Sequence, residues 1–207
     1  MFYIAKTPGW VRKFFSGSIW DVNEPEKSIY LSFDDGPHPV ITPFVLDELK
    51  KYNALATFFC IGKNVVENPL IFSRIQDEGH AVGNHTYDHL NGWKTSETEY
   101  LQNIAKAAKY IDSNLFRPPY GRIKAKQHKA LGKLDKPLKV VMWSVLSGDF
   151  DVNITPEKCC ENVLKNAERG SVIVFHDSEK AYERLRYALP LVLEYFSGKG
   201  YRFEKIV

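Results

Sequence analysis

The chain alternates between short apolar runs and longer segments with helical periodicity. The first run, SIYLSF at residues 28–33, is nearly all apolar, as expected for a strand covered on both faces. Strands that alternate with helices in this way predict an α/β fold built on a parallel sheet. Seven strands are predicted, at residues 28–33, 56–62, 80–85, 114–117, 138–145, 171–176 and 201–206.

Helices are predicted between these strands from their start and stop signals. Thr42 is expected to cap the first helix, with Pro43 as its first residue. A helix is expected to start at Asn68-Pro69, another after a cap at Thr95 or Ser96, and a third at Thr155-Pro156. Pro190 is expected to kink or restart the last helix. No linker or internal repeat interrupts the alternation, so we expect a single domain.

Composition limits the function classes. The 207 residues are 44% hydrophobic and 14% aromatic, which is typical of a folded globular protein. A net charge of only +3 argues against nucleic acid as a partner. The cysteines are odd in number and two are adjacent, so reduced, buried thiols are expected at Cys60, Cys159 and Cys160.

Residues 1–27 precede the first predicted strand and are expected to pack on the domain. Pro8 and Gly9 interrupt the segment, so we expect no secretory signal. The sequence contains no run of about 18 apolar residues, so no membrane span is predicted. We therefore expect a cytoplasmic monomer, with association with the cell envelope left open. The aromatic residues of the segment are expected to cap the core, and contact with a membrane or partner is the alternative; they are Trp10, Phe14, Phe15 and Trp20.

Reactive side chains follow strand after strand. In parallel α/β folds such residues collect at the carboxyl ends of the strands. Five loops spread along the whole chain converge more easily around a closed mouth than along an open sheet, so the pattern favours a barrel. The residues are Asp34 and Asp35, His85 and His89, Arg117, Asp149 and Asp151, and His176 and Asp177.

Two imidazoles and one carboxylate suggest a metal site. His85 and His89 lie within one short segment, and another loop can add an acidic residue. Such a set suits a catalytic divalent cation with open coordination positions, and zinc is the default ion.

The adjacent carboxylates in LSFDDGPHP need not do one job. Consecutive residues at a strand end point in different directions, so one carboxylate can bind a metal while the other acts as a base. The charge of the metal would offset their mutual repulsion. Gly36 and Pro37 then turn the chain away from the site.

Five segments together resemble the motifs of the polysaccharide deacetylases, the carbohydrate esterase family 4 or chitooligosaccharide deacetylase homology domain. They are SFDDGP, HTYDH, RPPYG, DF at residues 149–150 and VFH at residues 174–176. The resemblance spans roughly residues 28–205, and we take 28–207 as the catalytic domain. It implies a distorted (β/α)7 barrel similar to a TIM barrel.

The resemblance also implies the metal ligands and the base. Asp35, His85 and His89 would hold one divalent metal, zinc by default, with cobalt, nickel or manganese as alternatives. Asp34 would be the general base, and Arg117 would orient it through a charge-assisted hydrogen bond.

The remaining implied roles concern the acid and the substrate. His176 would be the general acid, paired with Asp149. The backbone N–H of Tyr120 would help to bind the oxyanion, and Val174 would line the pocket for the acetyl methyl group.

Three positions depart from the usual motifs and bear on the substrate. Leu146 stands where the fourth motif has an acid, Phe150 where it has Trp, and Val174 where the fifth motif has Leu. All three are expected to line the sugar and acyl pocket. Trp93 and Trp143 are candidates for stacking on a sugar, although core packing is the preferred interpretation for Trp143 because it lies inside a predicted strand.

The resulting hypothesis is a metal-dependent hydrolase that removes N-acetyl groups from peptidoglycan- or chitin-like glycans. One alternative is an amidase or O-deacetylase acting on a non-polymeric substrate. A second is an inactive carbohydrate-binding relative, against which the complete set of base, acid and ligands argues.

Overall fold

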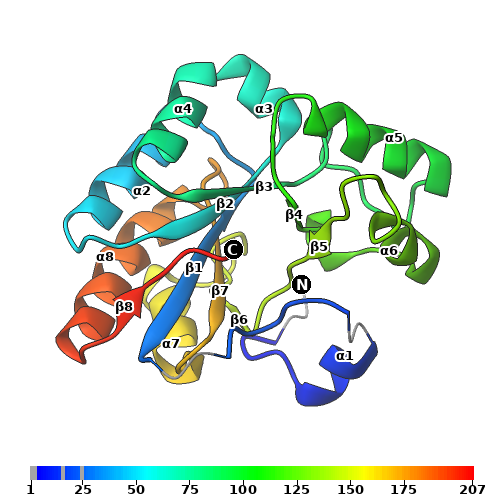
Figure 1. Cartoon of the computed structure of the whole chain (residues 1–207). Coiled ribbons are helices and arrows are strands. Elements are labelled where there is room, and N and C mark those ends of the chain that lie inside the picture. The colour runs from blue at the N-terminus through cyan, green and yellow to red at the C-terminus, as the bar shows by residue number, and fades with distance from the viewer. Residues whose placement is uncertain (1–3, 15–16, 24–25) are drawn as a thin grey trace.

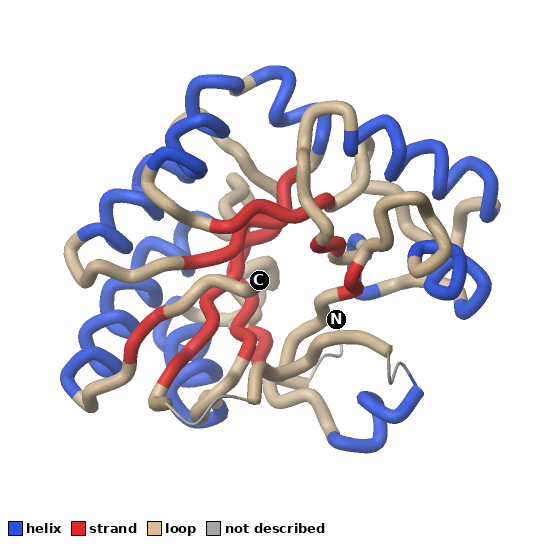
Figure 2. Tube along the Cα trace, in the orientation of Figure 1, coloured by secondary structure: helices blue, strands red, loops and turns tan. Residues whose placement is uncertain are grey.

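The computed structural model describes residues 4–14, 17–23 and 26–207. Phe15 and the side chain of Phe14 lie outside the described part, so the expectation for them is untested. The strands lie at the centre and the longer helices surround them (Figure 1, Figure 2). The strands are β1 (Ser28–Asp34), β2 (Ala56–Cys60), β3 (Ala81–Asn84), β4 (Leu115–Phe116), β5 (Lys139–Val140), β6 (Val145–Leu146), β7 (Val172–His176) and β8 (Arg202–Phe203).

All strand pairs are parallel, in the order β5-β4-β3-β2-β1-β7-β6, with β8 paired to the start of β1. The sheet curls around an interior cluster that includes Tyr30, Phe59 and Val172. The predicted α/β barrel is therefore confirmed, and every predicted strand segment contains a strand.

One predicted strand is wrong in its extent. The segment 138–145 forms two short strands, β5 and β6, instead of one. The strand β5 pairs with β4 and the strand β6 pairs with β7, so the chain crosses from one edge of the curled sheet to the other. Between them, the carbonyl oxygens of Val141 and Met142 accept hydrogen bonds from the Arg117 side chain, at 3.2 and 3.0 Å. Trp143 lies at this break and is partly buried against two core clusters.

The helices pack through apolar faces onto the outside of the strands. Phe33 of β1 stacks between Phe58 and Phe175 on this outer face, at ring-centroid distances of 5.1 and 6.1 Å. The helices are α1 (Gly9–Phe14), α2 (Ile41–Lys50), α3 (Gly62–Glu67), α4 (Pro69–Asp77), α5 (Glu97–Ala108), α6 (Ala125–Leu131), α7 (Pro156–Asn166) and α8 (Tyr182–Gly198), with a 3-10 turn at Pro119–Gly121.

Two helix predictions need correction. Thr42 is not the N-cap of α2, because the helix already begins at Ile41 and the Thr42 hydroxyl donates to Asp177. Of the two outcomes expected at Pro190, a kink or a restart, the restart is wrong, because α8 continues through this residue. The helix α3 was not predicted at all. The starts of α4, α5 and α7 at Pro69, after Ser96 and at Pro156 agree with their signals.

The described N-terminal residues fill the gap between β5 and β6. Ile19 accepts from Met142 N–H and donates to the carbonyl of Val140, at 2.7 and 2.8 Å, so it pairs like a short strand. Thr7 N–H donates to the carbonyl of Ser144 at 2.8 Å. Trp20 is buried, whereas Trp10 is 64% exposed. The segment thus provides backbone partners where the curled sheet does not close on itself.

Gly170 lies in close contact with this segment. Its φ is +81°, and a Cβ there would lie 2.2 Å from the carbonyl oxygen of Val22. The same two residues are joined by a hydrogen bond from Val22 N–H to the Gly170 carbonyl, at 2.9 Å. Close approach of the two backbones therefore requires glycine here.

We predict that Gly170→Ala lowers the free energy of unfolding by about 1–3 kcal/mol, because the new side chain meets both a left-handed backbone and the Val22 carbonyl. Gly198→Ala is the matched control, since a Cβ at Gly198 meets nothing within 4 Å. Urea unfolding of both variants measures the difference. Equal stabilities would show that the N-terminal segment does not dock as described.

Candidate active site

The site begins with side chains on the interior face of β1 and β7. Asp34 pairs with His176 across these strands, and Ser32 pairs with Val174. Side chains alternate along a strand, so these four residues share one face while Phe33 and Phe175 face the helices. The parallel pairing thus brings Asp34 and His176 together at the carboxyl ends of neighbouring strands.

Arg117 fixes the Asp34 carboxylate. Arg117 lies at the end of β4 with no exposed surface, and its Nη1 donates to Asp34 Oδ1 at 2.7 Å and to Ser32 Oγ at 2.8 Å. Its guanidinium also lies over the Phe59 ring at 4.0 Å. Every nitrogen of the group therefore has a partner, since the Val141 and Met142 carbonyls take the other two. Asp34 is held in one orientation beside a permanent positive charge.

The structure brings Asp35, His85 and His89 together. One potential ligand atom from each lies within 4.8 Å of the others. Asp35 Oδ1 is 3.2 Å from His89 Nε2 and 3.7 Å from His85 Nε2. Asp35 and His89 both have positive φ, +83° and +56°, which is uncommon for residues other than glycine. The backbone is thus strained where the ligand atoms converge.

The tautomer of His85 follows from its hydrogen bond. Its Nδ1 lies 2.8 Å from the carbonyl oxygen of Arg117, which can only accept, so Nδ1 carries the proton. Burial first of all lowers the pKa of His85, to about 4, so the ring is neutral at pH 7. The unprotonated Nε2 therefore directs a lone pair towards Asp35.

These observations fit a cation. Among the described residues, the buried Asp35 Oδ1 has no hydrogen-bond partner, although it faces the His85 lone pair. Burial opposes ionisation of Asp35, but the proximity of His89 and the charges of His176 and His85 outweigh it and hold its pKa well below the usual range. An ionised oxygen facing a bare imidazole nitrogen is repulsive unless a cation lies between them. Two imidazoles and a carboxylate form a donor set typical of zinc.

The backbone around the ligands is anchored by amide side chains. Asn64 Nδ2 in α3 donates to the carbonyl of Asp35 at 2.7 Å. Asn103 Oδ1 in α5 accepts from the backbone N–H groups of Tyr87 and Asp88, at 2.8 and 3.0 Å. Helices outside the barrel therefore hold both segments that bear the candidate ligands.

His176 and Asp149 form the second charged pair. Asp149 Oδ1 lies 2.7 Å from His176 Nδ1, and Oδ2 accepts from the His176 backbone N–H at 2.6 Å. Burial lowers the pKa of His176, but the Asp149 charge and hydrogen bond, followed by Asp35 and Asp34, outweigh it and raise the pKa to about 10. Arg184 Nε of α8 donates to the Asp149 carbonyl at 2.6 Å and holds the loop in place.

The expected substrate-binding residues lie at different depths. Tyr120 is 57% exposed, and its ring centroid is 4.6 Å from that of His89. The Phe150 ring meets His176 edge-on at 5.3 Å. Val174 and Leu146 are buried and paired in register between β7 and β6. Tyr120 and Phe150 therefore border the charged groups, while Val174 and Leu146 lie beneath them in the barrel.

Several residues around the site were missed by the sequence analysis. Asn64 was missed because α3 was not predicted. Arg184 lies in α8, outside the motifs, and no local signal marks it. Asp177 lies at a predicted strand end, but its sequence context predicts no role for it. Trp93 is 56% exposed, and its Nε1 donates to the Ile123 carbonyl at 3.2 Å, so sugar stacking there remains a proposal.

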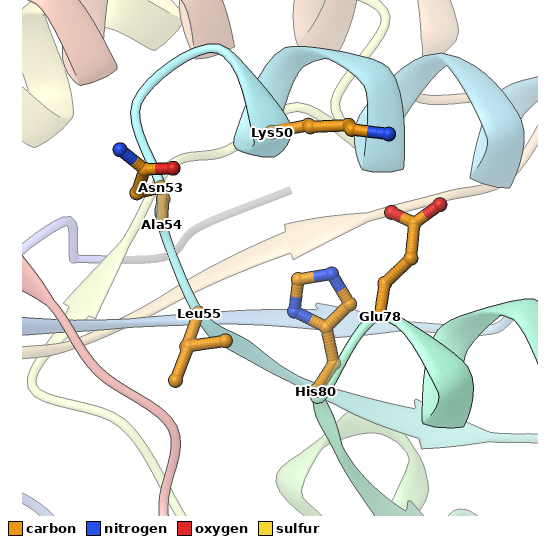
Figure 3. Close-up of a pocket in the computed structure, with 6 residues that line it drawn as sticks. All are labelled: Lys50, Asn53, Ala54, Leu55, Glu78 and His80. Carbon is orange, nitrogen blue, oxygen red and sulfur yellow. The ribbon is translucent and has the colours of Figure 1, made fainter.

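A separate hollow lies at the opposite end of the strands (Figure 3). Leu55 and His80 line it, and they immediately precede β2 and β3. Its volume is about 320 Å³. Burial lowers the pKa of His80 to about 4, and its Nδ1 accepts from Ala56 N–H. None of the charged groups described above lines this hollow, so it lies apart from the candidate active site.

Comparisons with known proteins identify the family to which the chain belongs. A family model described as polysaccharide deacetylase matches residues 21–137. A peptidoglycan-N-acetylglucosamine deacetylase from Bacillus cereus is 36% identical over 89% of this chain and 88% of its own length. A chitooligosaccharide deacetylase from Azorhizobium caulinodans is 37% identical over 78% of this chain and 79% of its own.

A solved structure shares the whole architecture. It is the Bc1960 peptidoglycan N-acetylglucosamine deacetylase in complex with 4-naphthalen-1-yl-N-oxidanyl-benzamide. The two chains are 34% identical and superimpose with a TM-score of 0.86, over 97% of this chain and 95% of the other. The family match, the extent of these similarities and the common fold show that the chain belongs to the polysaccharide deacetylase family of hydrolases.

Proposed function

We propose that this protein removes N-acetyl groups from N-acetylhexosamine units of a peptidoglycan- or chitin-like glycan, using one divalent metal ion. The observation that carries the proposal is the buried Asp35 Oδ1, which makes no hydrogen bond of ordinary geometry within the described residues although it lies 3.2 Å from His89 Nε2 and 3.7 Å from His85 Nε2. The named activities of the Bacillus cereus and Azorhizobium caulinodans relatives support the substrate class.

The cation would be held by Asp35, His85 and His89. Zinc is the first choice for two imidazoles and a carboxylate, and cobalt, nickel or manganese suit the same donors. When bound, such an ion would polarise the amide carbonyl and lower the pKa of a coordinated water. The hydrogen bond from His85 Nδ1 to the Arg117 carbonyl fixes the ring orientation that this role needs.

Asp34 would act as the general base. Its Oδ1 is bound to Arg117 at 2.7 Å, which keeps the carboxylate oriented while it removes a proton from the attacking water. The Tyr120 backbone N–H would donate to the developing oxyanion, a contribution of about 3–4 kcal/mol for a well-placed donor.

His176 would act as the general acid. Its Nδ1 faces Asp149, which leaves Nε2 to donate a proton to the amine as the C–N bond breaks. Water supplies the oxygen of the released acetate, and the sugar keeps a free amine. Phe150, Leu146 and Val174 would shape the acyl and sugar pocket around this step.

Two alternatives keep the same residues. An amidase or O-deacetylase acting on a small substrate would need the same base, acid and cation. An inactive carbohydrate-binding relative would not need Arg117 to hold Asp34 or Asp149 to hold His176. The presence of both charged pairs favours an active enzyme.

We propose that the enzyme acts as a monomer on acetylated glycans, with association with the cell envelope. All the candidate groups come from one chain, so the chemistry needs no second copy. Within the described residues, none of the helices combines the length and apolar character needed to span a bilayer. The named peptidoglycan substrates of the relatives support an envelope target.

Mass spectrometry of products from a panel of glycans tests the proposed function. Protein loaded with zinc is expected to release acetate and to lower the mass of N-acetylated chitooligosaccharides or peptidoglycan fragments by one acetyl group at a time, with the sugar chain intact. O-acetylated sugars and small acetamides serve as the comparison set. Preferred turnover of that set would favour the alternative enzyme, and no turnover of any acetylated compound would contradict the proposal.

Substitutions of the two adjacent carboxylates are predicted to have different effects on zinc content and activity. Asp34→Asn should keep bound zinc and lose activity by about 10²–10⁴-fold, the usual contribution of a general base. Asp35→Asn should lose bound zinc as well, because it removes an ionised ligand. Elemental analysis of both proteins after dialysis, beside activity assays, measures this difference. Equal zinc contents would contradict the proposed division of roles.

The dependence of the rate on pH should reflect the ionisation of His176 beside Asp149. The acid must be protonated, so the rate should fall as pH rises through the His176 pKa. A bound cation would repel the imidazolium, so this limb is expected below pH 10. Asp149→Asn removes the main influence that raises the His176 pKa, and the limb should move to lower pH. An unchanged limb in kcat/KM against pH would show that Asp149 does not tune the acid.

A further inference from the structure

Asp177 is a buried carboxylate to which neither the motifs nor the proposed mechanism gives a role. It follows His176 at the end of β7, and 1% of its surface is exposed. Its Oδ1 accepts from the backbone N–H of Gly36 at 3.0 Å, and its Oδ2 accepts from the hydroxyl of Thr42. Its own backbone N–H donates to the carbonyl of Asp34 at 3.1 Å. All these partners lie on or beside the loop that bears Asp34 and Asp35.

The contact with Gly36 leaves no room for a side chain. A Cβ on Gly36 would lie 2.0 Å from Asp177 Oδ2. Glycine therefore allows the carboxylate to reach the N–H group directly after Asp35. The Thr42 hydroxyl also accepts from His38 N–H at 2.7 Å, so both ends of the turn are tied to the same carboxylate.

Asp177 binds the backbone next to Asp35, whose conformation is strained. Asp35 has a φ of +83°, a conformation that costs an ordinary residue about 1–2 kcal/mol. Asn64 fixes the Asp35 carbonyl from the other side, and Ile61 N–H donates to the Gly36 carbonyl at 3.0 Å. The peptide group between Asp35 and Gly36 is therefore hydrogen-bonded at its carbonyl by Asn64 of α3 and at its N–H by Asp177.

We propose that Asp177 is a positioning residue, which holds the Asp35 carboxylate in its metal-binding orientation and couples the β1 loop to the β7 loop that bears His176. This inference rests on the proposed function, because it assumes that Asp35 binds a cation. The hydrogen bonds of Asp177 described above go to the backbone of Gly36 and Asp34 and to the hydroxyl of Thr42. Asp177 acts through the Gly36 N–H and the Thr42 hydroxyl.

Metal affinity measured without substrate tests this role. Asp177→Ala removes both acceptors, whereas Asp177→Asn keeps an oxygen for Gly36 N–H. Thr42→Val and Thr42→Ser form a second pair, in which the serine keeps the hydroxyl. Ile75→Val is the control for a general loss of stability, since Ile75 is fully buried in α4 and is not part of these contacts. Zn²⁺ affinity is measured by chelator competition, and the absorption spectrum of the Co²⁺-loaded protein reports the ligand geometry.

Asp177→Ala is expected to weaken Zn²⁺ binding by about 10- to 100-fold and to alter the Co²⁺ spectrum. Asp177→Asn and Thr42→Ser should recover most of the affinity, Thr42→Val should lie between, and Ile75→Val should match the wild type. With a glycan that the enzyme turns over, kcat of Asp177→Ala should fall by a larger factor than the factor by which KM changes. If Asp177→Ala does not fold, the Thr42 pair decides the question in the same way.

The outcomes separate this inference from the proposed function. Wild-type affinity and an unchanged Co²⁺ spectrum in Asp177→Ala or, failing that, in Thr42→Val would overturn the positioning role alone. Equal weakening in Ile75→Val would also overturn it, because the effect would then follow stability. A wild-type protein that binds neither Zn²⁺ nor Co²⁺ would overturn the proposed function and this inference together.

Discussion

The guanidinium group of Arg117 joins parts of the chain that are far apart in sequence. It binds Asp34 and Ser32 of β1 and the carbonyl oxygens of Val141 and Met142, all without exposure to solvent. The backbone carbonyls that it occupies lie between β5 and β6, where the chain passes from pairing with β4 to pairing with β7, so one side chain stabilises both this break and the Asp34 carboxylate. Removing one partner of a buried ion pair typically costs about 3–5 kcal/mol, because the other charge is left uncompensated. Fold and site are therefore linked through this group.

Around that pair, two histidines are held in different charge states, one by burial and the other by its carboxylate partner. The Nδ1 of His85 donates to a neutral carbonyl in a buried place, and burial lowers its pKa to about 4. The Nδ1 of His176 faces the Asp149 carboxylate, which helps to raise its pKa to about 10. One ring is thus suited to give a lone pair to a cation, and the other is suited to give a proton to a leaving group. For His85 the carbonyl fixes the tautomer and burial fixes the charge, whereas for His176 the carboxylate on Nδ1 fixes both.

Short-range sequence patterns correctly predict the elements whose signals lie within a few neighbouring residues. The apolar run 28–33 and the charged residues after it identify β1 and its loop, and the Pro and Ser signals place the starts of α4, α5 and α7. The break in segment 138–145 could not be read in this way, because the competing partner is Arg117, more than twenty residues earlier. Thr42 failed as a cap for the same reason, since its hydroxyl binds Asp177 across the sheet. Long-range hydrogen bonds outweighed local propensity at both places.

The candidate site shows the same limit. The motif residues Asp34, Asp35, His85, His89, Arg117, Asp149 and His176 were all named from the sequence, and the structure gathers them at one end of the barrel. Asn64, Arg184 and Asp177 support them through backbone groups, and such contacts leave no spacing pattern in the sequence. Their positions follow only from the three-dimensional pairing of β1 with β7 and of the loops with the outer helices.

The central claim is that Asp35, His85 and His89 together hold one divalent cation while Asp34 stays with Arg117. Anomalous diffraction from crystals of the protein loaded with Zn²⁺, collected above and below the zinc edge, tests it most directly. One strong peak per chain is expected, about 2.0–2.2 Å from Asp35 Oδ1 and from the Nε2 atoms of both histidines, with Asp34 still bound to Arg117. A peak ligated by Asp34 in place of Asp35, or no ordered zinc between these side chains, would contradict it.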